Sequence, residues 1–336
     1  MFMWMKWMVR MQCFSWNMEN RMGALSTKHF IKLEGSPKED IQHLIDTGLM
    51  FREVLDRPIK KVPSLTGKNV VNLFFENSTR TRMSFELAEK RLSADVTNFS
   101  ASSSSLNKGE SFKDTIQNIH AMKMDCVVMR HPVPGSCYQL THYVDAIVIN
   151  AGDGKHEHPT QAMLDMMSLY EKFGYLKGLK VAIIGDISHS RVALSNIHGL
   201  ITMGAEVTLC GPPHLIPVGI KELGVSVSHN VDEVVEWADA LNILRIQRER
   251  MGVGLIPSVR EYRDFFGITQ ERLNQHKKEI VIMHPGPINR GVEIDSSVAD
   301  GDQAIILDQV LNGVAVRMSI LYSLLGPEEE GKDEKK

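Results

Sequence analysis

The sequence predicts an α/β fold with two doubly wound domains, each built on a parallel sheet. Short apolar runs of strand length mostly lack polar alternation, as strands buried on both faces do; they lie at 70–76, 126–130, 146–152, 181–186, 206–211, 240–246 and 280–285. Stretches with helical spacing lie between them, at 79–92, 111–123, 160–173, 190–203, 232–238 and 269–277. This alternation is typical of the fold class, and 336 residues exceed one ordinary core.

The boundary between the two domains is expected at residues 174–180, GYLKGLK. This stretch has two glycines and no helical or strand periodicity. It divides the chain into two α/β units of similar size. The last helical stretch, LDQVLNGVAVRMSILYSLL, follows the final strand and is expected to return to the first unit.

Composition and charge exclude several classes of protein. The net charge of −3 argues against a general nucleic-acid surface. The sequence has no apolar run of about 18 residues, so no membrane-spanning segment is expected. The four cysteines form no CxxC pair and no metal-binding spacing, which favours a reducing, cytoplasmic location.

Residues 1–24 form an N-terminal extension of unknown role. The first 22 residues are rich in Met and Trp and lack the long apolar stretch and cleavage site of a signal peptide. Two interpretations remain open: an upstream start codon with Met22 as the natural start, or a short helical arm that docks on a partner.

The stretch FFENSTRTRMSF, at 74–85, combines a predicted strand end with a predicted helix start. Free N–H groups and the positive end of the helix dipole make such a turn a ready anion site. Arg80 adds a planar fork that matches phosphate. Helix capping explains one hydroxyl but gives no reason for the paired arginines Arg80 and Arg82. We therefore expect an anion site that also uses the hydroxyls of Ser78, Thr79 and Thr81.

Two further positive side chains follow in the first unit. Lys108 lies in the polar stretch ASSSSLNKGESF, which is either a flexible surface loop or a lid that closes over an anionic substrate. Arg130 ends a predicted strand in MRHP, so it should lie at the same sheet edge as Arg80. A lone arginine at a strand end is often only a surface charge, but two at matching edges favour a shared site.

His158 and Gln161 lie three residues apart in HEHPTQ and should share one face at a helix start. The HxH pattern suggests a metal, but an adjacent third ligand is missing, and no metal is expected. A neutral histidine and a glutamine directed at a polarised carbonyl fit better beside a phosphate site.

The second unit repeats the pattern of polar side chains after strands. The GxGxxG fingerprint is absent after VAIIGD, which disfavours a nicotinamide cofactor, and no cofactor is expected. The HPGP turn at 284–287 is rigid and can direct backbone carbonyls into a cleft. Small anionic ligands, two in number, would suit these strand ends, which also carry Arg191, Arg245 and Gln247.

These motifs together resemble the catalytic chains of the aspartate carbamoyltransferase family, from about Leu25 to Leu325. The resemblance rests on the order of STRTR, KGE, MRHP, HPTQ, the Arg191 turn, RIQ and HPGP. It implies a carbamoyl-phosphate domain at 25–160 and 308–326, and an aspartate domain at 175–305. It also implies transfer of a carbamoyl group from carbamoyl phosphate to L-aspartate, a step in pyrimidine (UMP) biosynthesis.

The resemblance also assigns roles to residues. Phosphate would be held by Ser78, Thr79, Arg80 and Thr81. The carbonyl oxygen or its neighbours would contact Thr81, Arg130 and His158. The carbamoyl amide would be held by Gln161 and the backbone around Pro285, Gly286 and Pro287. Aspartate would be bound by Lys108, Arg191, Arg245 and Gln247. In the family, the loop with Ser104 and Lys108 enters the neighbouring subunit's site, which implies a homotrimer.

Several alternatives stay open. Ornithine carbamoyltransferases typically carry HCLP in place of HPGP and an SMG-like motif in place of RIQRER, and arginines suit a dicarboxylate better than a cationic amine. Another amine acceptor or a non-catalytic anion-binding homologue are the alternatives. The stretch HPGPINRGVEID differs from the HPLPRVDEI of the enterobacterial enzyme that binds regulatory chains, so either a dihydroorotase-like or a regulatory partner chain remains open.

Overall fold

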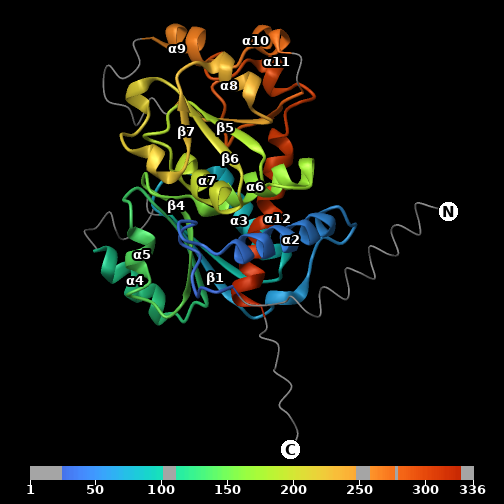
Figure 1. The fold of residues 1–336 in the computed structure, drawn as a ribbon. Coiled ribbons are helices and arrows are strands. Elements are labelled where there is room, and N and C mark those ends of the chain that lie inside the picture. Colours follow the sequence, from blue (N-terminus) through green and yellow to red (C-terminus); the bar gives the residue numbers. More distant parts are fainter. Residues whose placement is uncertain (1–24, 101–110, 247–257, 277–278, 327–336) are drawn as a thin grey trace, which may run out of the picture.

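The computed structural model of the chain describes residues 25–100, 111–246, 258–276 and 279–326. It contains two parallel sheets in separate lobes (Figure 1). The first has the strand order β2-β1-β3-β4 and the second β7-β6-β5-β8-β9, with parallel pairing throughout. The strands of the first sheet are β1 (Asn69–Phe74), β2 (Asp95–Ser100), β3 (Cys126–His131) and β4 (Ile147–Asp153). Those of the second are β5 (Lys180–Ile184), β6 (Glu206–Cys210), β7 (Ser226–Ser228), β8 (Ala240–Ile243) and β9 (Val281–Met283).

Helices connect the strands and cover the sheets, which confirms the predicted doubly wound fold. The first half carries α2 (Lys38–Leu55), α3 (Thr79–Arg91), α4 (Phe112–Ala121), α5 (Ser136–Leu140) and α6 (Pro159–Phe173). The second half carries α7 (Arg191–Thr202), α8 (Val231–Trp237), α9 (Val259–Phe266), α10 (Gln270–Gln275) and α11 (Ser296–Ala299). The last helix, α12 (Ile306–Leu325), packs against α2, α3 and α6. It therefore returns to the first sheet, as the sequence predicts.

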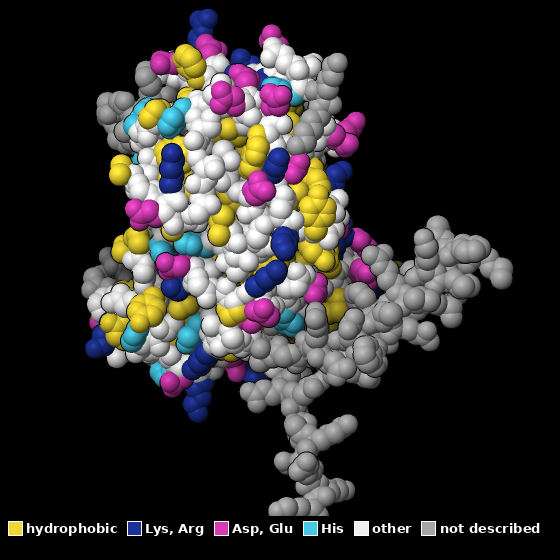
Figure 2. Space-filling view, in the orientation of Figure 1, with side chains coloured by type: hydrophobic (Ala, Val, Ile, Leu, Met, Phe, Trp, Pro, Cys, Tyr) yellow, Lys and Arg dark blue, Asp and Glu magenta, His cyan; other side chains and the backbone are white. Residues whose placement is uncertain are grey.

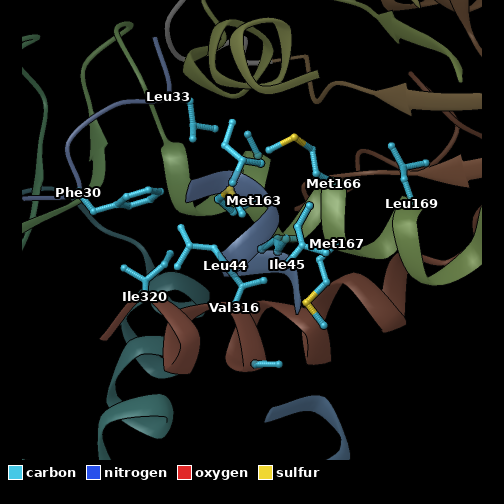
Figure 3. Packing of buried hydrophobic residues seen from close by; sticks show 14 of the residues in the cluster. Phe30, Leu33, Leu44, Ile45, Met163, Met166, Met167, Leu169, Val316 and Ile320 are labelled. Atoms are coloured by element: carbon cyan, nitrogen blue, oxygen red, sulfur yellow. The ribbon is translucent and has the colours of Figure 1, made fainter. Parts of the chain in front are cut away.

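Three helices form the centre of the largest core. Figure 3 shows side chains of α2, α6 and α12 meeting there, among them Leu44 and Ile45, Met163 and Met167, and Val316 and Ile320. Gly48 on α2 permits this close approach, because an added Cβ would lie 2.8 Å from Sδ of Met167. The position of α6, buried between these helices, fixes its first turn, which carries His158 and Gln161.

The sequence analysis missed the strands β2 and β7 and the helices α2, α5, α9 and α11. Strand β2 lies at a sheet edge with exposed polar side chains, so it lacks the continuous apolar run of the other strands. Strand β7 has only three residues, also at an edge. Helix α2 precedes the first predicted strand, although its buried residues Ile41, Leu44, Ile45, Gly48 and Phe51 do have helical spacing.

The described residues show mixed surface charge, free cysteines and no membrane-spanning helix. Acidic and basic side chains of the described residues are interspersed on the face shown in Figure 2. Cys126, Cys137 and Cys210 are free and buried. Within the described ranges, no helix is long and apolar enough to cross a membrane.

Glu89 on α3 is a buried acid whose titration should lower stability at high pH. Its carboxyl group accepts a hydrogen bond from Asn72 Nδ2 at 2.8 Å, and burial raises its pKa to about 8. The unfolded state loses this proton near pH 4.5 and the folded state near 8, so stability falls as pH rises between these values.

Replacing Glu89 by Gln should remove this loss and raise the free energy of unfolding at pH 8 by about 4 kcal/mol relative to the wild type. Urea unfolding at pH 5 and pH 8 measures it. Glu86→Gln is the matched control, since Glu86 lies on the same helix and is paired with Lys90. Equal pH dependence in the wild type and Glu89→Gln would contradict the prediction.

Candidate active site

The carboxyl ends of β1 and β3 place the first predicted site residues side by side. Phe74 pairs with Arg130 across the two strands, so Arg130 lies at the edge where the chain enters α3. Ser78 is the N-cap of α3, yet its side chain makes no capping hydrogen bond. Thr81 is buried in the first turn. The hydroxyl of Ser78 and the N–H groups of this turn can therefore serve an anion.

Arg80 meets residues from the second half of the chain. Burial lowers its pKa, and the positive charge of Arg245 lowers it further, so the two guanidinium groups act on each other. An added Cβ at Gly286 would collide with the guanidinium of Arg80. Two arginines and the HPGP turn thus converge from both sheets, an arrangement that a bound anion would stabilise.

Glu76 joins the predicted arginines of the two halves. Arg191 Nη1 lies 2.6 Å from Glu76 Oε1 and its Nη2 lies 3.2 Å from Oε2. Arg130 Nη2 lies 3.8 Å from Glu76 Oε2, and Arg130 Nη1 donates to the carbonyl oxygen of Ala151 at 3.2 Å. Gly152 leaves room for both arginines, because an added Cβ would lie 3.0 Å from Arg191 Nε. The sequence analysis did not identify Glu76, although it directly follows the strand in FFEN.

His158 is buried at the N-terminus of α6. The backbone N–H of His158 donates to Ser195 Oγ at 2.9 Å, and Ser195 Oγ donates to Glu157 Oε2 at 2.8 Å. Its imidazole Nδ1 lies 3.4 Å from Thr160 Oγ1. Burial lowers the pKa of His158 well below its usual value, and the lowering is increased by Arg130, Arg191 and Arg317. The imidazole is therefore neutral at pH 7, able to donate a hydrogen bond to a polarised oxygen.

Gln161 and the HPGP turn have defined hydrogen bonds. Gln161 Nε2 donates to Asp165 Oδ1 at 3.0 Å, one helical turn along α6. The N–H of Gly286 donates to His284 Nδ1 at 2.7 Å, which helps to fix the turn between Pro285 and Pro287. The other predicted site residues, Ser104, Lys108 and Gln247, lie outside the described residues.

Arg317 is a buried cation that the sequence analysis missed, because it lies inside the apolar stretch of α12. Its Nη1 donates to Ser84 Oγ at 3.0 Å and to the carbonyl oxygen of Gly313 at 2.8 Å. Its guanidinium carbon lies 5.0 Å from the ring centre of Phe85. Burial lowers its pKa to about 10. Arg317 thus connects α12 to the helix that begins in the STRTR motif.

Within the part of the chain that the structure describes, no group of three or more His, Cys, Asp or Glu side chains could hold a metal ion. His156, the first histidine of the HxH pattern, instead pairs with Asp153 at 3.1 Å. The site is built from arginines, hydroxyls, a neutral histidine and amides, which suits phosphate and carboxylate groups.

Two adjacent family models cover most of the chain. Residues 28–171 match the aspartate/ornithine carbamoyltransferase carbamoyl-P binding domain, and residues 177–324 match the Asp/Orn binding domain of the same family. The chain belongs to the aspartate/ornithine carbamoyltransferase family. The described site lies where residues of these two matched regions meet.

Curated relatives and solved structures agree with this family. The aspartate carbamoyltransferase catalytic subunit of Christiangramia forsetii is 60% identical over 300 residues, covering 89% of this chain and 97% of the relative. That of Cytophaga hutchinsonii is 55% identical, covering 91% and 99%. Aspartate transcarbamoylase of Trypanosoma cruzi in complex with N-(phosphonacetyl)-L-aspartic acid has a TM-score of 0.82 at 30% identity, covering 91% of this chain and 97% of that chain. The catalytic subunit of M. jannaschii aspartate transcarbamoylase has a TM-score of 0.78 at 34% identity, with coverage of 89% and 98%.

Proposed function

We propose that this carbamoyltransferase moves the carbamoyl group of carbamoyl phosphate to the amino group of L-aspartate, producing N-carbamoyl-L-aspartate and phosphate. The observation that carries the proposal is the convergence of Arg80, Arg245 and Gly286 beside the start of α3. The relatives named as aspartate carbamoyltransferases, and the Trypanosoma cruzi structures with carbamoyl phosphate and aspartate, support the same substrates. The reaction is a step of pyrimidine biosynthesis.

The donor, carbamoyl phosphate, is held mainly by residues of the first half of the chain. The phosphate is bound by the start of α3, with N–H groups, the fork of Arg80, and the hydroxyls of Ser78, Thr79 and Thr81. The carbonyl oxygen faces Thr81, Arg130 and the neutral His158. The amide is held by Gln161 and by the backbone around Pro285, Gly286 and Pro287.

The acceptor is bound through its two carboxylates by Arg191, Arg245 and Gln247, together with Lys108. In this structure Arg191 is paired with Glu76, so an incoming carboxylate would share or replace that partner. The amine nitrogen attacks the carbonyl carbon, and a tetrahedral oxyanion forms. The C–O bond to phosphate then breaks, and the leaving phosphate accepts the proton of the amine. No separate protein base is needed, which agrees with the lowered pKa of His158, because burial and nearby arginines make its imidazole a weak base.

The chain is proposed to act as a cytoplasmic homotrimer. Ser104 and Lys108 would then reach the site of a neighbouring subunit. The resemblance of the KGE motif to that of the family supports this assembly.

A paired turnover assay tests the proposed function. The purified protein receives carbamoyl phosphate with either L-aspartate or L-ornithine, and the carbamoylated product is quantified. We expect product with aspartate and less than about 1% of that rate with ornithine, because paired arginines repel a cationic side chain. Product with ornithine alone would overturn the choice of acceptor, and no product with either amine would overturn the activity.

A further inference from the structure

Asp165 on α6 is completely buried at the junction of the two halves and receives four amide donors. Its Oδ1 accepts from Gln161 Nε2 at 3.0 Å and from Gln309 Nε2 at 2.8 Å. Its Oδ2 accepts from Asn196 Nδ2 at 2.8 Å and from Asn242 Nδ2 at 3.3 Å. The donors come from α6, α12, α7 and β8, so one carboxylate joins four elements.

The orientation of two of these amides is fixed by backbone groups. Gln309 Oε1 accepts from the N–H of His284 at 3.0 Å, and a backbone N–H can only donate, so Gln309 must present its Nε2 to Asp165. Asn196 Nδ2 also donates to the carbonyl oxygen of Val192 at 3.0 Å, and a carbonyl can only accept. Each carboxylate oxygen therefore faces a fixed donor.

This arrangement matches an ionised carboxylate. Two oxygens with about four acceptor sites take four N–H donors without a proton of their own. Burial raises the pKa of Asp165, and the four amides act against that rise by donating to the charged form. An ionised carboxylate can only accept hydrogen bonds, so the NH₂ group of Gln161 must also point at Asp165 Oδ1.

We propose that Asp165 is the positioning residue for Gln161, and that it makes the site selective for a donor that carries an amide. By holding Nε2, Asp165 leaves Gln161 Oε1 on the opposite side of the side-chain amide, where it can accept from the NH₂ of the carbamoyl group. If the amide of Gln161 were reversed, its NH₂ would face the NH₂ of the carbamoyl group. Two donors would then meet without an acceptor, and the carbamoyl donor would bind poorly. The inference rests on the proposed function, since it concerns the same carbamoyl group.

The same carboxylate also reaches the second amide-holding element. Gln309 bridges the N–H of His284 and Asp165, and His284 begins the HPGP turn. Gln161 and this turn come from opposite halves of the chain, and α12, which carries Gln309, packs along α6 (Figure 1). Asp165 therefore aligns both contacts to the carbamoyl amide through one hydrogen-bonded chain.

The test compares carbamoyl phosphate with acetyl phosphate, which has a methyl group in place of the amide. Both donors form an N–C bond to aspartate and release phosphate. The ratio of kcat/KM for carbamoyl phosphate to kcat/KM for acetyl phosphate does not depend on the fraction of active protein, so a loss of folded enzyme leaves this ratio unchanged. Asp165→Asn lets Gln161 reverse, and we expect this ratio to fall about tenfold. Gln161→Glu places two carboxylates against each other, and we expect a similar fall.

The swapped pair Gln161→Glu with Asp165→Asn restores a donor at 165 and an acceptor at 161, and should recover most of the ratio. Ser168→Ala is the control on the same helix. Ser168 is buried, and its Oγ bonds to the carbonyl oxygen of Leu164 and to Asn312 Nδ2 rather than to Gln161 or Asp165, so the ratio should stay at the wild-type value. An unchanged ratio in both single variants would overturn the proposal. Absence of wild-type product would instead overturn the proposed function on which it rests.

Discussion

Replacing His158 by Ala should lower kcat about 10²- to 10³-fold while the protein remains folded. The imidazole is one of three groups proposed to face the carbonyl oxygen, and loss of one donor to a developing oxyanion typically has this effect. The KM for carbamoyl phosphate should change less, because the oxyanion contact strengthens in the transition state. Steady-state kinetics with carbamoyl phosphate and L-aspartate measure both values.

The pH profile tests whether His158 changes its charge between pH 6 and 8. Burial and three nearby arginines lower the pKa of His158, so the neutral form persists as pH falls from 8 to 6. If His158 instead titrated in this window, kcat would fall with pH as the imidazole gains its proton. We therefore expect His158 to contribute no slope to the kcat profile between pH 6 and 8. Any slope that the wild type shows in this window should also be present in His158→Ala.

Two variants sharpen this prediction. His156→Gln is the matched control, because His156 lies two residues away, is half-buried and pairs with Asp153, and it should keep near wild-type kcat. His158→Gln retains a donor in a different place. If His158→Gln kept most of the turnover, the polarising role of the imidazole would be refuted.

The strands were predictable where burial alone determines the residue pattern. Central strands such as β3 and β5 are covered on both faces, so they read as continuous apolar runs. The edge strand β2 carries exposed polar side chains, and its pairing with β1 stabilises it more than its composition suggests. The missed helix α2 had the right spacing, but its partners on α6 and α12 are more than 100 residues away in sequence.

The site was predictable in its residue types and less so in its pairings. Polar side chains after parallel strands indicate a shared edge, and the described residues Arg80, Arg130 and His158 do lie in that region. The ion pair of Glu76 with Arg191 spans 115 positions, and the hydrogen bond of Asp165 with Gln309 spans 144. No local spacing encodes such contacts, because they depend on how the two sheets meet. The roles of all the predicted site residues remain predictions, and Ser104, Lys108 and Gln247 also lie outside the described residues.

Replacing Gly286 by Ala should reduce kcat/KM for carbamoyl phosphate about 10²-fold. The new methyl group would occupy the place of the Arg80 guanidinium, which is the far end of a flexible side chain and would shift. The phosphate would then lose its planar fork at the start of α3, and a displacement of about 1 Å in a substrate contact can have an effect of this size. Kinetics at varied carbamoyl phosphate with saturating aspartate measure the change.

The neighbouring Gly291 separates displacement of Arg80 from backbone strain. Gly286 has φ +62° and Gly291 has φ +79°, so Ala at either position adopts the left-handed region at a cost of about 1 kcal/mol or more. An added Cβ at Gly291 meets nothing within 4 Å. Gly291→Ala should therefore lose similar stability in urea but keep its kcat/KM. Equal losses of activity in the two variants would attribute the effect to the strained backbone, whereas a loss confined to Gly286→Ala would mean that the HPGP turn keeps Arg80 in place for the phosphate.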